Sequence, residues 1–521
     1  MRVIEHFDRG AERFPERACL VDAHGARSYE DVRHASHVIA NALIRARQAP
    51  GTKAAVYSAN AARSFECVLG ILRAGLVWVP VNVRNTVADS IFTLQACEVE
   101  VLFYQSAFRE NARAMAAACA GVRVLVCIDG TDAGAAAFEE FTAGCAAAAP
   151  EPPGSDDDVA TLFSSGGTTG VPKAVMMSHR SWESMTMGCQ LLMPASDPVH
   201  LVAAPMTHAA GGSALAYASM GMTNVMLPGF EPAAVMQAIE QHRVTHLFLP
   251  PTAIYRLLAH PAVREHDYSS LRYFTYASAP MSIEKLKEAV AVFGPVMTNS
   301  FGQSETGLLN TYLSPAEVAA AARAGDDRRL ASVGRATPWF RIEIMSDDGT
   351  LLPRDTPGEI VLQSAQVSPG YFKNPEETVH ARTFGWHHTG DIGMQDADGY
   401  LYIVDRKKDM IITGGFNVYP AEVERVLADH PDVQDCAVIG VPDPEWGERV
   451  TAVVELKSGR AATPGELMAF CRGRLAGYRT PKEIRFTALL PRSPVGKVLR
   501  RLVREQATNA SADGPEKDRT P

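Results

Sequence analysis

The fold of this chain is constrained most by a repeated alternation of short apolar, β-rich runs with helical patterns. Among the β-rich runs are "KAAVYS", "VWVPVN", "VRVLVCI", "THLFLP" and "LRYFTYA", and helical stretches such as "SFECVLGILRAG" and "IEKLKEAVAVF" follow them. This alternation is typical of parallel sheets covered by helices. At 521 residues the chain is too long for one core of ordinary size, so we expect at least two domains.

The pattern changes near residue 390. There, "GMQDADGYLYIV" carries an Asp-Gly turn between two strand-like runs. After "DRKKDMIITGG" the sequence predicts helix, strand, strand, helix and strand over about 100 residues, a normal size for a separate α+β domain. The predicted fold is therefore α/β: a large N-terminal domain of parallel-rich sheets flanked by helices, followed by a small α+β domain. The last residues, 506–521, have little to bury, and we expect a disordered tail.

Charge and composition exclude several classes of function. A net charge of −9 argues against nucleic-acid binding, which requires a basic surface. The nine cysteines include no C-x-x-C pair, a pattern that favours reduced thiols over disulfides or zinc. The N-terminus lacks the apolar core of a signal peptide, and no apolar run approaches the roughly 20 residues of a membrane span. We expect a cytoplasmic protein with no transmembrane segment, and the sequence leaves peripheral membrane contact open.

A dense cluster of small residues, "SSGGTTGVPK", ends at Lys173 and follows a predicted strand. One interpretation is a polar hairpin turn. The interpretation that we favour is a phosphate-binding loop, in which glycines expose backbone N–H groups, hydroxyls add donors and the lysine supplies positive charge. It is not the common P-loop, because Pro172 precedes the lysine and Ala174 follows it.

Three further polar loops also follow predicted strands: "PMTHAAGG", "ASAPMS" and "NSFGQSETG". Each alone has a structural explanation: His208 as a buried histidine, the second loop as a helix cap, Glu305 as a solvated acid. In open α/β sheets, however, ligands bind outside the carboxyl ends of the strands. Four such loops at that edge therefore indicate one composite site.

The chain resembles the adenylate-forming superfamily of acyl-CoA synthetases, luciferases and peptide-synthetase adenylation domains, from the first helix to about residue 505. The resemblance rests on "SSGGTTGVPK", "SFGQSET", "WHHTGD", "DRKKDMIITGGFNVYPAEVE" and "PRSPVGKVLRR", in the family's order. The chain is most similar to free-standing bacterial fatty-acyl or aryl-CoA ligases. The resemblance implies two steps. A carboxylate attacks the α-phosphate of ATP and gives acyl-AMP and pyrophosphate, and the thiol of coenzyme A then gives acyl-CoA and AMP.

The resemblance also implies a nucleotide site. The glycine-rich loop would hold the β- and γ-phosphates, Glu305 would ligate Mg²⁺, Phe301 would stack on adenine, and Asp391 would accept the ribose hydroxyls. Phe301 replaces the family's usual tyrosine and Ser304 its threonine, which removes one hydroxyl and keeps the other. The implied nucleotide-binding residues are Ser165, Gly166, Gly167, Thr168, Thr169, Gly170, Lys173, Ser278, Ala279, Pro280, Phe301, Gly302, Gln303, Ser304, Asp391 and Arg406.

Two lysines carry the mechanism that the resemblance implies. Lys497 would bridge the substrate carboxylate and the α-phosphate, and Lys408 matches the hinge of the small domain. The implied domains are therefore residues 1–407 and a mobile domain of residues 408–505. Rotation at the hinge would withdraw Lys497 and bring a glycine loop beside the pantetheine of coenzyme A. The implied coenzyme A contacts are Gly414, Gly415, Trp446, Tyr478, Arg84 and Lys482.

The acid substrate is constrained by the loop around His208, which matches the family's gate to the acyl site. Small residues at 209–212 leave room for a bulky or long group, and residues 206–212, 276–281 and 301–303 contain no Arg or Lys. A second carboxylate would be buried unpaired, so dicarboxylic acids are disfavoured. We expect a monocarboxylic acid, either a medium- or long-chain fatty acid or an aryl acid.

Three alternatives to a CoA ligase remain. One is an adenylating enzyme that delivers the acyl group to a carrier protein, and a second is a luciferase-like oxygenating relative. The third, a non-catalytic nucleotide sensor, is disfavoured because a sensor does not need the reaction-specific Lys497. We expect a monomer or homodimer.

Overall fold

The computed structural model describes residues 1–151, 154–164, 173–492 and 498–512, with side chains through residue 508. Within these residues the chain forms two compact units. The first lies within Met1–Gly167, Pro172–Arg341 and Leu362–His387, and the second within Ile342–Val361 and His388–Pro521. The division near residue 388 agrees with the change of pattern in the sequence near 390. The boundary between residues 407 and 408 stays a prediction.

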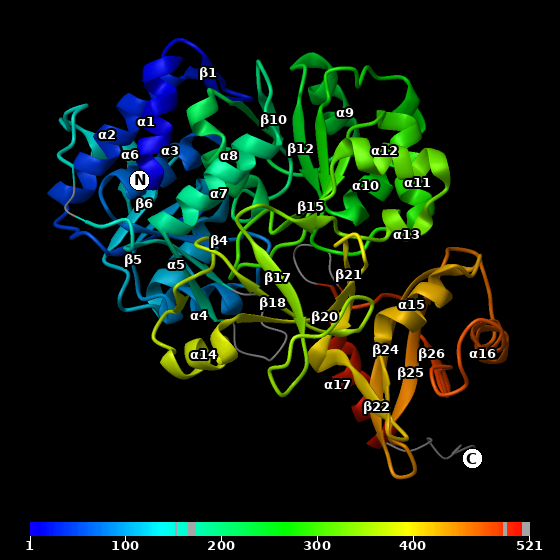
Figure 1. Ribbon diagram of the computed structural model, residues 1–521. Coiled ribbons are helices and arrows are strands. Elements are labelled where there is room, and N and C mark those ends of the chain that lie inside the picture. The colour runs from blue at the N-terminus through cyan, green and yellow to red at the C-terminus, as the bar shows by residue number, and fades with distance from the viewer. Residues whose placement is uncertain (152–153, 165–172, 493–497, 513–521) are drawn as a thin grey trace, which may run out of the picture. The chain divides into compact units, whose positions relative to one another are not determined.

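The first unit contains a seven-stranded sheet in the order β14-β13-β12-β10-β11-β1-β2 (Figure 1). Neighbouring strands from β14 through β1 are parallel, and β2 is antiparallel to β1. The strands are β1 (Ala18–Asp22), β2 (Gly25–Ser28), β10 (Val199–Val202), β11 (Thr223–Met226), β12 (His246–Leu249), β13 (Tyr273–Tyr276) and β14 (Met297–Asn299).

An eight-stranded sheet in the order β19-β9-β8-β4-β3-β5-β6-β7 forms the other half of this unit. Strands β8, β4, β3, β5, β6 and β7 run parallel, whereas β9 is antiparallel to both β8 and β19. Every residue of β4 is buried, as expected for a parallel strand with both faces covered. The strands are β3 (Lys53–Tyr57), β4 (Val77–Val81), β5 (Val99–Tyr104), β6 (Val124–Cys127), β7 (Ala136–Ala137), β8 (Val159–Ser164), β9 (Ala174–Ser178) and β19 (Gly370–Tyr371).

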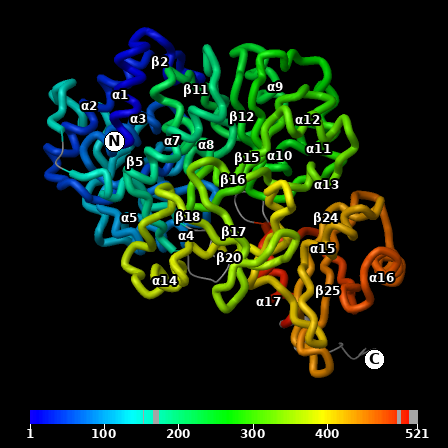
Figure 2. Tube along the Cα trace, in the orientation of Figure 1, coloured from blue at the N-terminus to red at the C-terminus, as the bar shows by residue number. Residues whose placement is uncertain are grey.

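Helices pack against both sheets. Figure 1 shows α1, α2, α3 and α6 together on one side of the unit, and Figures 1 and 2 show α9 to α13 together near β12 and β15. A short pair, β15 (Thr311–Tyr312) and β16 (Arg335–Ala336), completes the unit. The helices are α1 (Val3–Arg13), α2 (Tyr29–Arg45), α3 (Ala62–Arg73), α4 (Val87–Ala96), α5 (Arg109–Ala118), α6 (Phe138–Thr142), α7 (His179–Leu192), α8 (Ala209–Ala216), α9 (Pro232–Gln241), α10 (Pro251–Leu258), α11 (Ile283–Phe293), α12 (Pro315–Ala324), α13 (Asp327–Leu330) and α14 (Pro375–His380).

The second unit is α+β. A four-stranded sheet in the order β17-β18-β20-β21 lies almost entirely within it, and a five-stranded sheet joins β23, β22, β25 and β24 in that order, with β26 beside β25. The predicted succession of helix, two strands, helix and strand is confirmed. The elements are β17 (Arg341–Met345), β18 (Gly358–Gln363), β20 (His387–Gln395), β21 (Leu401–Arg406), β22 (Ile411–Thr413), β23 (Phe416–Val418), α15 (Pro420–Ala428), β24 (Val433–Asp443), β25 (Gly447–Leu456), α16 (Pro464–Arg472), β26 (Glu483–Phe486) and α17 (Arg500–Ala512).

The C-terminal helix corrects one expectation. Helix α17 continues through Ala512, into the segment 506–521 that the sequence predicts to be a disordered tail. Val503 and Ala507 explain the extension, because both are buried in one cluster with Ala437, Ile439 and Val441 of β24. This burial stabilises a helix whose polar composition had indicated little to bury. Residues 513–521 lie outside the described residues.

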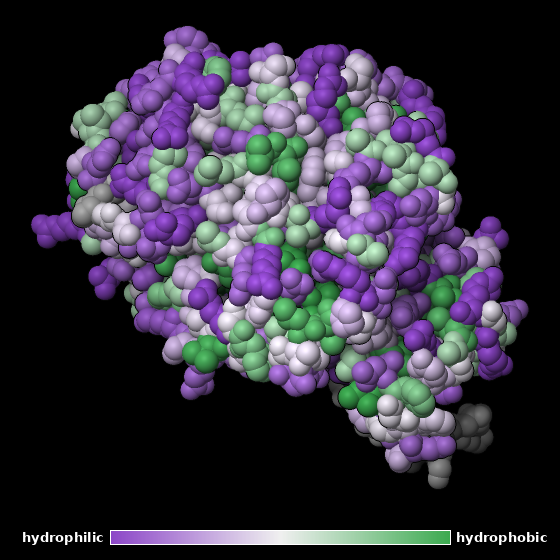
Figure 3. Space-filling model, viewed as in Figure 1, coloured by the Kyte–Doolittle hydropathy of each residue, from purple (hydrophilic) through white to green (hydrophobic). Residues whose placement is uncertain are grey.

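The face of the molecule in Figure 3 is largely hydrophilic. In the face shown in Figure 3, hydrophilic side chains cover most of the first unit, and hydrophobic groups occur in separate small areas. Across the described ranges, no helix combines the length and the apolar composition that crossing a bilayer requires.

Candidate active site

The glycine-rich loop connects β8 to β9 in the first unit. Its residues Ser165, Gly166, Gly167, Thr168, Thr169 and Gly170 lie outside the described residues. Lys173 is described and stands immediately before β9. Its ammonium forms an ion pair with Glu377 of α14 and lies 5.3 Å from the centre of the Tyr371 ring. The predicted phosphate-binding lysine therefore has a defined position at the start of β9.

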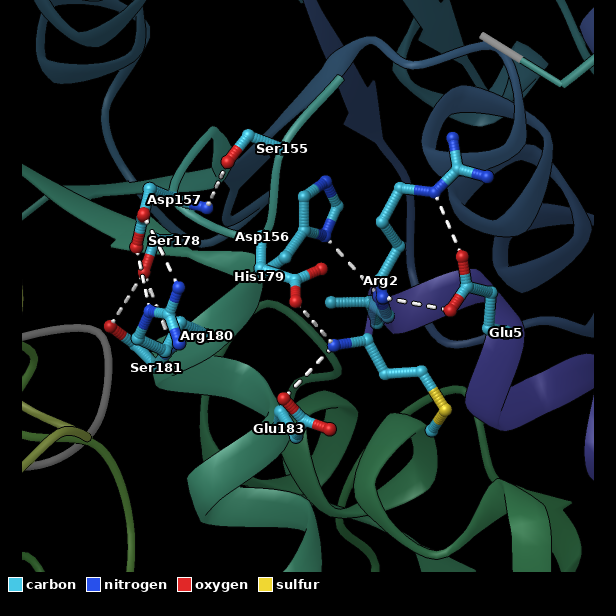
Figure 4. Close-up of polar contacts among 12 residues, drawn as sticks. Arg2, Glu5, Ser155, Asp156, Asp157, Ser178, His179, Arg180, Ser181 and Glu183 are labelled. Carbon is cyan, nitrogen blue, oxygen red and sulfur yellow. Dashed lines mark hydrogen bonds and ion pairs between the residues drawn. The ribbon is translucent and has the colours of Figure 1, made fainter. Parts of the chain in front are cut away.

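The base of this hairpin is anchored by polar contacts that Figure 4 shows. Arg180 donates from its backbone to the carbonyl of Asp156 at 2.7 Å and from Nε to Asp157 at 2.7 Å. His179 accepts a hydrogen bond from the backbone of Val3 at 3.2 Å. Burial lowers the pKa of His179 to about 4, so the ring is neutral at pH 7 and Nδ1 is free of a proton. These contacts hold the ends of β8 and β9 that lie away from the glycine-rich loop.

The loop after β14 carries Gly302, Gln303, Ser304 and Glu305. The backbone N–H of Gly307 donates to the carbonyl of Gln303 at 2.8 Å and closes a tight turn. A Cβ on Gly302 would lie 2.3 Å from the carbonyl oxygen of Gly307, so this position needs glycine. The turn holds Glu305 half-buried at one end of the loop.

Glu305 contacts Tyr371, a residue that the sequence did not single out. The phenol of Tyr371 donates to Oε1 of Glu305 at 3.1 Å, and the backbone of Ser368 donates to the Glu305 carbonyl at 2.7 Å. Burial, and then the Glu305 charge, raise the pKa of Tyr371 well above its usual value, so the phenol keeps its proton. Tyr371 therefore contacts both predicted residues: its ring face lies near the Lys173 ammonium, and its hydroxyl donates to the Glu305 carboxylate.

The predicted loops leave two sheets, which corrects the expectation of a single edge. The loops after β10, β13 and β14 belong to the seven-stranded sheet, whereas the glycine-rich loop follows β8 of the eight-stranded sheet. In the first sheet, Tyr276 pairs with Asn299, so the segment 278–280 and the loop of Phe301 leave neighbouring parallel strands. Ser278, Ala279 and Pro280 are exposed, Phe301 is 5% exposed, and Ser278 has φ +74°.

The loop of His208 is held by Asn60, which the sequence also did not single out. The amide of buried Asn60 donates to the carbonyls of Val202 and Ala204 at 3.2 and 3.0 Å, and its oxygen accepts from the backbone of Met206 at 2.8 Å. His208 is exposed and precedes α8. No pattern in the sequence around Asn60 indicates this role, because its partners lie more than 140 positions away.

The two glycines of α8 differ in what surrounds them. A Cβ on Gly211 would lie 1.8 Å from the carbonyl oxygen of Met206, so Gly211 permits a close backbone approach. A Cβ on Gly212 would lie 3.8 Å from Leu308 and 3.9 Å from Trp182, at ordinary contact distance. Gly212 therefore faces side chains, and Gly211 faces backbone.

In the second unit, the β20–β21 pairing places Asp391 opposite Arg406. Arg406 Nε and Asp391 Oδ1 are 2.6 Å apart, and the Asp391 side chain is 5% exposed whereas that of Arg406 is 41% exposed. Thr389 accepts a hydrogen bond from the Asp391 backbone at 3.1 Å. The structure thus brings together two of the residues that the resemblance assigns to the nucleotide.

The segment that follows β21 contains exposed Lys408, flanked by anchored neighbours. Arg500 of α17 bonds Asp405 at 3.0 Å and Asp409 at 3.2 Å. Lys407 pairs with buried Glu359 at 2.9 Å. The predicted hinge residue therefore lies between two fixed points of the second unit. Lys497 lies outside the described residues.

The candidate coenzyme A residues of the second unit gather around one hairpin. Gly414 and Gly415 both have positive φ and form the two-residue turn between β22 and β23. The backbone of Gly414 donates to the Trp446 carbonyl at 2.8 Å. Tyr478 stacks on Phe416 with ring centres 4.7 Å apart, which adds an aromatic residue that the sequence reasoning missed.

Two cations complete the set of candidate coenzyme A residues. Lys482 lies 5.1 Å from the centre of the Trp446 ring, in the second unit. Arg84 belongs to the first unit, where it is exposed on the loop after β4 and approaches Gly229.

A model of the AMP-binding enzyme family matches residues 7–372, and a model of the AMP-binding enzyme C-terminal domain matches residues 422–497. The chain belongs to the AMP-binding enzyme family. The match confirms the expected superfamily, and CoA ligases of this family use ATP and coenzyme A.

Relatives of this AMP-binding enzyme cover almost its whole length. A feruloyl-CoA synthase of Amycolatopsis sp is 35% identical over 96% of this chain and 97% of its own. A fatty acid–[acyl-carrier-protein] ligase of Streptomyces coeruleorubidus is 31% identical over 93% of this chain and 92% of its own length. The amide bond synthetase McbA from Marinactinospora thermotolerans has a TM-score of 0.87 at 30% identity, over 97% and 99%. The fold class and the expected class of enzyme, an adenylate-forming ligase, are confirmed.

Proposed function

We propose that this AMP-binding enzyme is an ATP-dependent ligase that joins a monocarboxylic fatty or aryl acid to coenzyme A. In the first step, a carboxylate oxygen attacks the α-phosphorus of ATP, the bond to the β-phosphate breaks, and acyl-AMP and pyrophosphate form. In the second step, the sulfur of coenzyme A attacks the acyl carbonyl carbon, loses its proton and displaces AMP.

The observation that supports the first step most strongly is the position of Lys173 and Glu305 around Tyr371. Both reactants of this step are anions, so the enzyme has to reduce their repulsion. A lysine at the end of a glycine-rich loop suits the phosphates of ATP.

One carboxylate in the same region suits Mg²⁺, which proteins often hold with one or two carboxylates together with phosphate oxygens and water. In the described ranges no three acidic, cysteine or histidine side chains gather as a metal site, which fits an ion that arrives with the nucleotide. When bound there, Mg²⁺ would neutralise phosphate charge, and Glu305 would hold it.

The remaining proposed nucleotide contacts include Asp391 and Arg406 of the second unit. Asp391 is nearly buried and has Arg406 at 2.6 Å, so its carboxylate is held ready to accept hydrogen bonds from ribose hydroxyls while Arg406 reaches solvent. Phe301 and the exposed segment 278–280 flank adenine in this proposal. Lys497 supplies positive charge between the acid and the α-phosphate, and Lys408 is the hinge that exchanges one half-reaction for the other.

The aromatic residues around the glycine hairpin favour coenzyme A as the acceptor. Phe416 is 55% exposed and stacks with Tyr478, and Lys482 lies over the Trp446 ring. Exposed rings beside a cation suit an adenine base and its phosphates. We place the coenzyme A nucleotide on this surface. Arg84, in the first unit, stays a prediction as a phosphate contact.

The acid is proposed from the surroundings of Gly212. Trp182 and Leu308 lie at contact distance from a Cβ built there, so one aromatic and one aliphatic side chain lie beside Gly212. The loops contain no cation for a second carboxylate. The names of the Amycolatopsis and Streptomyces relatives include one aryl and one fatty acid ligase, in agreement with both acids that we propose.

The test compares acceptors. The purified enzyme is incubated with ATP, Mg²⁺ and a panel of fatty, cinnamic and benzoic acids, with either free coenzyme A, an acyl carrier protein or no acceptor. We expect AMP and pyrophosphate, and thioester on free coenzyme A. Release of ADP would refute the proposal. Thioester on the carrier protein alone would favour the second candidate function, an adenylating enzyme that delivers the acyl group to a carrier protein, which the name of the Streptomyces relative supports. The matched inactive control is Lys173→Met. The cytoplasmic location and the monomeric or homodimeric state stay predictions.

A further inference from the structure

Tyr371 contacts two residues that come from separate parts of the chain. Its phenol donates to Oε1 of Glu305 at 3.1 Å, and its ring lies 5.3 Å from the Lys173 ammonium. In the function proposed above, these residues hold the metal ion and the phosphates of one nucleotide. The role of Tyr371 therefore concerns both halves of that site.

The backbone around Tyr371 is held closely. Strand β19 pairs with β9, with Tyr371 opposite Val175, and Tyr371 donates from its backbone to the hydroxyl of Thr378 at 3.0 Å. Gly370 has φ +142°, and a Cβ there would lie 2.4 Å from Thr378. The strand pairing and this close approach therefore hold the backbone from which the phenol reaches Glu305.

The same segment also holds the loop of Glu305. Gln366 donates from its amide to the carbonyls of Thr306 and Leu308 at 2.8 and 2.6 Å, and Ser368 donates to the carbonyl of Glu305 at 2.7 Å. Residues 366–371 thus fix the main chain of the loop, and Tyr371 adds a contact to its carboxylate. With its backbone fixed in this way, the loop presents the Glu305 carboxylate to the Tyr371 hydroxyl.

A carboxylate that binds a metal ion benefits from a hydrogen bond to one oxygen, because this bond orients the group and leaves the other oxygen available. A phenol suits this task, since it donates one proton. Its ring face attracts the Lys173 ammonium, which also forms the ion pair with Glu377 of α14. One tyrosine can therefore orient both the carboxylate and the lysine.

We propose that Tyr371 is a positioning residue for the nucleotide site, whose hydroxyl orients Glu305 toward the metal ion and whose ring orients Lys173 toward the phosphates. This inference rests on the proposed function. It predicts that the hydroxyl and the ring have separable effects, one on the metal ion and one on the nucleotide.

Two substitutions separate these effects. Tyr371→Phe removes the hydroxyl and keeps the ring, and Tyr371→Leu removes both. The matched control is Tyr268→Phe, which removes a buried phenol that donates to the carbonyl of Val263 at 2.8 Å in the same unit. Binding of Mn²⁺ is measured by electron paramagnetic resonance with α,β-methylene-ATP, and binding of the same analogue without metal is measured by calorimetry in EDTA.

We expect Tyr371→Phe to weaken Mn²⁺ binding about tenfold and to change metal-free binding of the analogue less than about twofold, as for loss of a group that orients a metal ligand. Tyr371→Leu should weaken both, and Tyr268→Phe neither. In the Glu305→Gln background, Tyr371→Phe should cause no further loss, because its hydroxyl acts through that carboxylate. This comparison also separates positioning from a general loss of stability.

Wild-type affinity for Mn²⁺ in Tyr371→Phe would overturn the inference, as would an equal loss with and without the Glu305 carboxylate. If the unsubstituted enzyme bound neither Mn²⁺ nor the ATP analogue, the proposed function itself would be refuted. That result is distinct from a failure of the inference, which shows only as a difference among the variants. Should Tyr371→Phe be poorly folded, Tyr371→Leu at reduced temperature applies the same test to the lysine: unchanged metal-free binding of the analogue would refute its orientation by the ring.

Discussion

Replacing Gly212 with leucine should shorten the range of acids that the enzyme accepts. The first added carbon meets Leu308 at 3.8 Å and Trp182 at 3.9 Å, so it fits, and the three further carbons occupy space that we assign to the acyl group. If the new side chain excludes two or three methylene groups of a long acid, about 0.8 kcal/mol of transition-state binding free energy is lost for each group. The value of kcat/KM for the longest acid should therefore fall about 15- to 60-fold. The value of kcat/KM for acetate should change less than about threefold, because acetate does not reach this space.

The assay is pyrophosphate release over a series of unbranched acids and substituted benzoic acids, with Gly212→Ala and Gly211→Ala as the two controls. Gly212→Ala should fold and retain most activity. Gly211→Ala should lose stability and activity toward every acid alike, because its Cβ would lie 1.8 Å from the Met206 carbonyl oxygen. An equal loss for acetate and for the longest acid in Gly212→Leu would refute the assignment of this space to the acyl group.

Three further outcomes are expected. Lys497→Ala should lose the adenylation step about 10²-fold or more while it still converts supplied acyl-AMP and coenzyme A, as pyrophosphate exchange and thioester formation would show. Lys408→Pro should lose thioester formation and keep pyrophosphate exchange, because proline blocks the backbone rotation, and equal loss of both steps in either variant would contradict the hinge. Burial lowers the pKa of His179, His200 and His246 to about 4, so the unfolded chain binds more protons between pH 6.5 and 4. The free energy of unfolding should therefore decrease as the pH is lowered from 6.5 to 4, by at most about 1.4 kcal/mol per pH unit for each histidine. A free energy of unfolding from urea denaturation that stays constant over this range would contradict the prediction.

The sequence predicted the parts of the site that depend on local chemistry. A lysine after a glycine-rich loop and an acid after a predicted strand identify Lys173 and Glu305 as candidates without knowledge of the fold. Tyr371 could not be found in this way, because its role depends on the pairing of β19 with β9, almost 200 residues apart in the chain. Asn60 escaped prediction for the same reason, since its partners are backbone carbonyls of another strand end.

The fold class followed from the alternation of strands and helices, but the number of sheets did not. The periodicity of β8 resembles that of β10, and only strand pairing assigns them to different sheets. Gly211 and Gly212 are likewise equivalent in the sequence, and only the approach of Met206 distinguishes them. The helical residues beyond 505 were predicted to be disordered because their composition is polar, whereas Ala507 is buried in one cluster with residues of β24.

The position of Trp446 gives the enzyme an optical probe of its own. Of the five tryptophans, Trp446 is the most exposed at 37%; Trp339 is half-buried, Trp386 is 7% exposed, and Trp78 and Trp182 are each 1% exposed. Excitation at the red edge of the tryptophan band, with iodide as a quencher, should therefore report more on Trp446 than on any other indole. Since Lys482 lies 5.1 Å from its ring, a ligand that neutralises or displaces the ammonium should alter both the emission and its access to iodide. Stopped-flow fluorescence on the unlabelled enzyme could then follow events at the β22–β23 hairpin separately from those at the glycine-rich loop.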